Sequence, residues 1–153
     1  MNQFEPGLLA VTGTGAFIIV LVFIVLVVLP LIYYLLTLQS ILKEVSPENR
    51  KMAPEQVWLS LIPLFGIIWQ YYIVARLADS LRLEFNKRNI YSNEARPGYQ
   101  TGIIFCILIS CIIIPYIGVA ALVGGLVSWV IYWVRINEFR NVLIENPLNY
   151  LSQ

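Results

Sequence analysis

The chain has 153 residues, of which 59% are hydrophobic and only 12% are charged, and its formal net charge is +1. Soluble domains contain about 45–50% apolar and about 25% charged residues, so this composition excludes an ordinary soluble domain. The small net charge excludes a broad basic surface for nucleic acid, and the absence of histidine removes the commonest metal ligand and general base. We therefore expect no metal, no cofactor and no nucleic-acid partner.

The charges are segregated along the chain. Lys, Arg, Asp and Glu are all missing from residues 6–42, 56–75 and 97–134. Each gap is at least as long as the roughly 20 apolar residues that a helix needs to cross a bilayer. The pattern predicts an all-α fold, a polytopic integral membrane helical bundle that forms a single membrane domain over residues 1–153. We expect four apolar segments: three full spans plus one re-entrant or kinked helical segment.

The first span, residues 13–42, is almost purely aliphatic and β-branched. Such a surface suits lipid tails, so we interpret it as a lipid-facing anchor that Pro30 kinks. In the polar loop that follows, Ser46-Pro47-Glu48 and Ala53-Pro54-Glu55 are each typical of a helix start, with proline at the first helical position and an acid in the first turn.

The second apolar segment, residues 57–75, is interrupted by Pro63 and Gly66. Two interpretations remain open, a kinked helix that crosses the bilayer and a re-entrant segment that turns at these two residues. One helix over this range would be about 28 Å long, which is enough to span. Trp58 and Trp69, however, are too close in sequence to mark opposite interfaces along a helix.

The distribution of basic residues favours the re-entrant interpretation. All ten lie between Lys43 and Arg140, so the positive-inside bias places the N-terminus outside and the first polar loop in the cytoplasm. If residues 57–75 return, all ten are cytoplasmic, and so is the C-terminus. If they cross, only Lys43, Arg50 and Lys51 remain inside.

Residues 76–89 predict a cytoplasmic amphipathic helix. Leu77, Leu81 and Phe85 form an apolar stripe at a spacing of four, and charged side chains, including a Glu84–Arg88 pair, cover the other faces. A solvated helix and a helix that docks a partner or the membrane surface both fit this pattern.

The third apolar region is too long for one span, because a helix over residues 101–134 would be about 51 Å long. A turn at Pro115-Tyr116-Ile117-Gly118 divides it into hairpin spans at 99–115 and 118–135, with a helical extension to 145. The predicted interface anchors are aromatic residues and the arginines that follow them: Trp58, Trp69 and Arg76 in the second segment, and Trp129, Trp133 and Arg135 in the last.

Small residues in the last span predict close helix packing, either within the chain or between subunits. They are Ala120, Ala121, Gly124, Gly125 and Ser128. Gln70 is the one strongly polar side chain deep in the second segment. It either makes an interhelical hydrogen bond or lines a polar cavity.

The block from Pro54 through Trp58, Ile62-Pro63, Gly66 and Tyr71-Tyr72 to Arg76 resembles the central block of a bacterial family of small polytopic membrane proteins whose domain has no assigned function. That block has a tryptophan-rich stretch, an Ile-Pro break and an amphipathic helix. The family tends to have Asn where Gly66 lies and a second proline near Gln70. The resemblance implies architecture and no activity.

No catalytic constellation is visible, because no carboxylate falls within a predicted span and no phosphate-binding glycine motif occurs. We expect a non-enzymatic small integral membrane protein of the bacterial cytoplasmic (inner) membrane, either a structural or accessory subunit of a membrane complex or a homo-oligomer. Its partners would be the lipid bilayer and other membrane-protein subunits or copies of itself. The alternative is a channel or transporter component that uses the Pro/Gly-broken helices.

Overall fold

The computed structural model describes residues 6–114 and 116–147, so the predicted break residue Pro115 lies outside the described residues. The described residues are all-α, with five α-helices and no strand. The chain divides into two compact units, residues 1–34 and residues 35–153, which are described separately. By length and composition, two helices are apolar enough to cross a membrane, Thr14–Glu44 and Gly118–Glu145.

The first unit is helical throughout its described part. Helix α1 (Pro6–Phe23) leads into a π-helical turn, η1 (Ile24–Val28), and α2 (Leu29–Glu44) begins immediately afterwards. The wide turn closes with a hydrogen bond from the Leu29 N–H to the Ile24 carbonyl, five residues back. Pro30 follows at once, and its ring would crowd the carbonyl four residues earlier in a regular α-helix. The structure thus has a π-turn immediately before Pro30, whereas the kink predicted at Pro30 stays a prediction.

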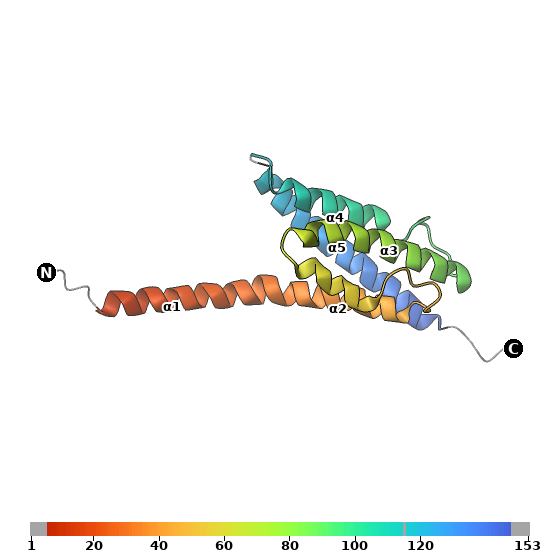
Figure 1. Cartoon of the computed structure of the whole chain (residues 1–153), viewed down its shortest axis with the longest axis horizontal. Coiled ribbons are helices and arrows are strands. Elements are labelled where there is room, and N and C mark those ends of the chain that lie inside the picture. Colours follow the sequence, from red (N-terminus) through yellow and green to blue (C-terminus); the bar gives the residue numbers. More distant parts are fainter. Residues whose placement is uncertain (1–5, 115, 148–153) are drawn as a thin grey trace. The chain divides into compact units, whose positions relative to one another are not determined.

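The second unit contains the rest of α2, a 3₁₀-helix η2 (Pro54–Leu61), and helices α3 (Phe65–Lys87), α4 (Tyr99–Cys111) and α5 (Gly118–Glu145). Helix α4 packs against both α3 and α5, and η2 lies along α3 (Figure 1). The end of α2 contributes four fully buried side chains to the core: Leu35, Leu38, Ile41 and Leu42.

The polar loop between α2 and η2 differs in part from the sequence expectation. Pro54 is the first residue of a helix, as predicted, but that helix is a short 3₁₀-helix. The predicted start at Ser46-Pro47-Glu48 is wrong, because residues 47–49 form only a turn. The Ser46 side chain does not cap a helix there, since it donates a hydrogen bond to Glu84 of α3 instead.

The chain reverses direction between η2 and α3. Ile62 is extended, as the residue before a proline prefers, and Leu64 has a φ of 64°. The Trp69 indole N–H donates to the Gln56 carbonyl at 2.8 Å. On one continuous helix these residues would be about 20 Å apart along the axis. The break at Pro63 is thus a hairpin turn in the structure, whereas a single kinked helix over 57–75 would keep its direction.

The loop before η2 runs antiparallel to α3 along most of that helix. Asn49 Nδ2 donates to Glu84 near the end of α3, and the Lys51 N–H donates to Ser80 one turn earlier. Because η2 continues this course to Trp69, the polar loop at 43–53 and the second half of α3 lie at the same end of the unit.

The apolar stripe predicted on residues 76–89 is buried inside the chain. Leu77, Leu81 and Phe85 are all buried, and the Phe85 ring meets Phe139 of α5 edge to face, 5.7 Å between centroids. Ile136 and Leu143 of α5 are buried as well. The chain itself therefore covers the faces that sequence analysis left open for a docking partner.

Candidate functional site

Large apolar side chains are exposed around the η2–α3 hairpin. Leu64 at its tip is 78% exposed and Ile68, one turn into α3, is 71% exposed. The same end of the α4–α5 hairpin also exposes apolar residues: Ile107, Ile113, Val119, Leu122 and Val123. Exposed apolar side chains thus gather at this end of the unit, which is the kind of surface that lipid tails accept.

Both chain reversals depend on a close backbone approach at glycine. A Cβ on Gly66 would lie 2.0 Å from the Ser60 carbonyl oxygen, and a Cβ on Gly118 would lie 2.6 Å from the Ile112 carbonyl oxygen. The Gly66 N–H donates to the Ile62 carbonyl at 2.7 Å, which closes the first turn. The predicted turn residues Pro63, Gly66 and Gly118 therefore lie at the observed turns.

An aromatic ladder runs along one face of α3 from the hairpin tip. Phe65 stacks on Trp69 with centroids 5.2 Å apart, and Trp69 stacks on Tyr72 at 4.6 Å. The Arg76 guanidinium lies over the Tyr72 ring, 5.1 Å from its centroid. Two of the predicted anchors, Trp69 and Arg76, thus belong to one continuous surface.

The other predicted anchors are tied into the chain. The Trp58 and Trp133 indoles donate to side chains of α2, Gln39 at 3.3 Å and Thr37 at 3.0 Å. Trp129 lies beside Trp133 with ring centroids 5.4 Å apart. Arg135 pairs with Glu94 at 2.7 Å and with Glu138 at 3.6 Å, so its charge is already compensated within the protein.

The small residues of α5 divide between a packed and an open face. Ala121, Gly125 and Ser128 are buried, and Gly124 is half-buried against Leu108 of α4, whereas Ala120 is exposed. The nearest neighbours of Gly124 and Gly125 are Leu108 and Ile109, so at these two positions the packing face is occupied by α4 of the same chain.

Gln70 is buried on α3, with 6% of its surface exposed, and it has a partner inside the chain. Its burial favours an internal partner over an open polar cavity, and the interhelical hydrogen bond itself stays a prediction.

A buried charged cluster at the polar end of the unit was missed by the sequence analysis. Glu84 is 0% exposed, and its carboxylate accepts hydrogen bonds from Ser46, Asn49 and Arg88. Burial raises the pKa of this carboxyl, but the hydrogen bonds from Asn49, Arg88 and Ser46 together outweigh burial and hold the pKa below its ordinary value. The Glu84–Arg88 spacing was visible in the sequence, but nothing in the sequence showed that the pair is buried.

Arg88 joins three helices at their C-terminal ends. Beyond its ion pair with Glu84, its guanidinium donates to the Glu44 carbonyl at the end of α2 and to the Leu143 and Asn146 carbonyls at the end of α5. Helix C-termini carry partial negative charge and unpaired carbonyls, so a guanidinium is well suited to this position. This cluster clamps the polar end of the bundle.

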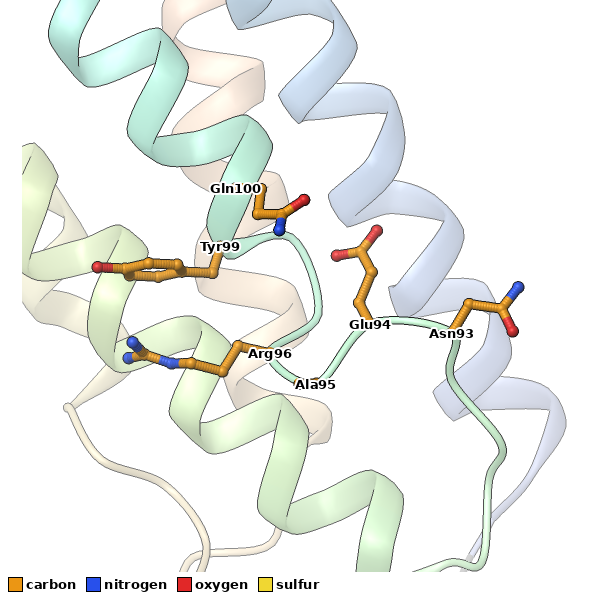
Figure 2. Close-up of a pocket in the computed structure, with 6 residues that line it drawn as sticks. All are labelled: Asn93, Glu94, Ala95, Arg96, Tyr99 and Gln100. Atoms are coloured by element: carbon orange, nitrogen blue, oxygen red, sulfur yellow. The ribbon is translucent and has the colours of Figure 1, made fainter.

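The linker between α3 and α4 forms a pocket of about 250 Å³ lined by residues 93–96, Tyr99 and Gln100 (Figure 2). Arg96 lies over the Tyr99 ring, 3.9 Å from its centroid, and pairs with Asp79 of α3 at 2.8 Å. Glu94 accepts from Arg135 of α5 and from the Gly98 N–H. The charged groups of this pocket are thus used to fasten the linker to α3 and α5.

Among the residues that the structure describes, no group of three or more His, Cys, Asp or Glu side chains is arranged to hold a metal ion. Cys106 and Cys111 are free thiols on α4.

Comparison with known proteins finds no matching family model, no matching curated protein and no matching solved structure.

Proposed function

We propose that the protein is a non-enzymatic polytopic membrane protein that serves as a structural or accessory subunit of a membrane complex, or as a homo-oligomer, in the cytoplasmic membrane of a bacterium. In this proposal the N-terminus is outside, and the continuous helix formed by α1, η1 and α2 crosses the bilayer once. The η2–α3 hairpin enters from the cytoplasm and returns to it. Helix α4 then crosses outward and α5 crosses back. The bacterial assignment rests on the resemblance of the block from Pro54 to Arg76.

The observation that carries the topology is the reversal at residues 62–64. Hydrogen bonds join Asn49 to Glu84, Lys51 to Ser80 and Gln56 to Trp69, so the segment before the turn runs back along α3, the segment after it. The basic residues on either flank then lie on one side of the bilayer, as the positive-inside bias favours. The exposed apolar side chains at the tip supply the surface that would enter the lipid.

Helix lengths support different depths for the two hairpins. From Arg76 back to Phe65 is about 16 Å of helix, whereas from Arg135 back to Gly118 is about 25 Å. The hydrocarbon core is about 30 Å thick, so the first hairpin reaches roughly its middle. The second crosses with local thinning of the bilayer, because its α4 arm, Tyr99–Cys111, is only about 20 Å of helix. Backbone groups at the first turn are partly satisfied by the Phe65 and Gly66 hydrogen bonds to Pro63 and Ile62.

The subunit role is supported by where apolar surface remains. The amphipathic faces at the polar end are covered by the chain itself, while the lipid-level faces of α4 and α5 are open. A partner or second copy would therefore meet this protein within the membrane, at the face that includes Ala120, Val123 and Val127.

Cysteine labelling tests the topology. With Cys106 and Cys111 replaced by alanine, Ser92→Cys should resist an impermeant maleimide in intact cells and react after permeabilisation. Tyr116→Cys, at the far turn between α4 and α5, is the matched control and should react in intact cells. Labelling of Ser92→Cys from outside would overturn the re-entrant hairpin.

Purification tests the subunit role. The protein expressed at its native level and extracted in mild detergent should elute with a stoichiometric membrane partner or as an oligomer, and Ala120→Trp should reduce that assembly. A monodisperse monomer with no partner would overturn this part of the proposal.

A further inference from the structure

Three basic side chains line one pocket beside α3, and the proposed membrane topology gives no reason for them to lie together. The pocket, about 250 Å³, is lined by Lys51, Arg76, Asp79, Arg82 and Leu83. In the part of the chain that the structure describes, none of these three cations has a carboxylate within ion-pair distance. The one acid in the pocket, Asp79, is held by Arg96 at 2.8 Å. The pocket therefore has an excess of positive charge that the chain does not compensate.

A buried serine holds the two elements of the pocket together. The Lys51 N–H donates to Ser80 Oγ at 2.9 Å, and Ser80 Oγ donates to the Arg76 carbonyl at 2.7 Å. Ser80 is fully buried, so this link is protected from water. The loop that carries Lys51 is thus fixed against the turn of α3 that carries Arg76. The backbone positions of Lys51 and Arg76 are therefore fixed relative to each other, so their side chains do not meet by chance.

The aromatic ladder places the pocket relative to the hairpin tip. Arg76 lies over Tyr72, and the ladder continues through Trp69 to Phe65 at the turn. Aromatic rings of this kind concentrate at the membrane interface, and arginine just beyond them reaches the lipid phosphates. Arg76 and Arg82 are about 9 Å apart along the helix, slightly more than the roughly 5–8 Å of one headgroup layer, a difference that their long side chains can bridge. The pocket is therefore at headgroup level if the hairpin enters the bilayer.

We propose that Lys51, Arg76 and Arg82 bind the phosphate group of an anionic lipid in the cytoplasmic leaflet. This inference rests on the membrane placement proposed above. Guanidinium groups bind phosphate through paired charge-assisted hydrogen bonds, and the lysine adds a point charge. Asp79 is compatible with the anion because Arg96 neutralises it.

Native mass spectrometry of the full chain in detergent tests the site. The probes are dioctanoyl phosphatidylglycerol, dioctanoyl phosphatidylcholine and inorganic phosphate. The wild type should bind a first phosphatidylglycerol at least about tenfold more tightly than phosphatidylcholine. A tenfold difference in affinity is about what one hydrogen bond to a charged group contributes. Arg82→Gln and Arg76→Gln should each weaken that binding by about five- to tenfold. Lys43→Gln is the matched control, because Lys43 is also exposed but lies outside the pocket.

Each outcome decides the proposal. Equal affinity for the two lipids, or equal loss in Lys43→Gln and Arg82→Gln, would overturn the site while leaving the membrane topology intact. Displacement of phosphatidylglycerol by millimolar inorganic phosphate would support a phosphate site but overturn its assignment to lipid. A protein that stays soluble and monodisperse without detergent would instead overturn the membrane placement itself. Unchanged thermal unfolding of Arg82→Gln establishes that weaker binding is not misfolding.

Discussion

The Arg88 guanidinium lies 2.7 Å from the Glu84 carboxylate, with only 8% and 0% of their side chains exposed. The pair has hydrogen bonds on both sides, from Ser46 and Asn49 to the carboxylate and from the guanidinium to carbonyls of α2 and α5. A buried ion pair of this kind is stable only while it is complete, because either charge alone is costly to bury. The ends of three helices depend on it.

Removing the cation should be strongly destabilising. Arg88→Met leaves the Glu84 carboxylate buried without its counter-ion and removes the caps on α2 and α5, so we expect a loss of about 3–5 kcal/mol in the free energy of unfolding. The adjacent Lys87 pairs with Glu48 at the surface, and Lys87→Met should cost no more than about 1 kcal/mol. Denaturant titration of the detergent-solubilised chain measures both. Similar losses in the two variants would contradict the role given to Arg88.

The depressed pKa of Glu84 predicts acid sensitivity. Its pKa is lower in the folded chain than in the unfolded chain, where it is about 4.3, so the unfolded state binds the proton more readily. The stabilisation is complete above that value and is lost as the pH falls through the folded pKa. The unfolding temperature should therefore drop below about pH 4. Glu84→Gln should be less stable at pH 7 but should show a shallower acid dependence. An identical pH profile in both proteins would contradict this assignment.

Gly66→Ala tests the hairpin turn. The added methyl carbon would lie 2.0 Å from the Ser60 carbonyl oxygen. The backbone fixes the positions of both atoms, so relieving the clash requires the main chain of η2 or of α3 to shift. We expect a loss of at least about 2 kcal/mol, in the upper range of overpacking costs, with displacement of η2 from α3. Gly15→Ala is the control, since a methyl group there meets nothing within 4 Å and alanine favours the helix. Unfolding midpoints report the loss of stability, and the fluorescence of the four tryptophans, which include Trp58 of η2 and Trp69 of α3, reports the displacement. Equal stability of both variants would show that the turn is not closed as described.

The helices were largely predictable because their signal is local. Apolar run length and the Pro/Gly breaks at Pro63 and Gly118 depend only on neighbouring residues, and the structure has turns at both. The burial of Glu84 was not predictable, because it depends on Ser46 and Asn49 more than thirty residues away. The proximity of Lys51 and Arg76, which line the proposed anionic-lipid site, was not predictable for the same reason. Sequence periodicity identifies a helix face, but only tertiary packing determines what covers that face.

Gly102 is the contact point of three helices, and its substitution tests the core of the second unit. A Cβ there would lie 2.6 Å from Val74 Cγ1 of α3 and 2.8 Å from Tyr132 Cε2 of α5. Both obstacles are side chains, so we expect Gly102→Ala to cost about 1–3 kcal/mol, with part of the strain relieved by rotation. Val74→Ala removes the nearer obstacle. The double variant should therefore lose less than the sum of the two single variants, with a coupling of about 0.5–2 kcal/mol.

Gly124→Ala is the matched control for this double-mutant cycle of Gly102→Ala and Val74→Ala. A methyl group there would meet Leu108 at 3.6 Å, an ordinary contact, so this variant should be neutral or slightly stabilising. Chemical denaturation of the four proteins of the cycle measures the coupling. Additive losses at Gly102 and Val74 would mean that α3 and α4 do not meet at this point. The close approach of α3 and α4 at Gly102 would then be wrong.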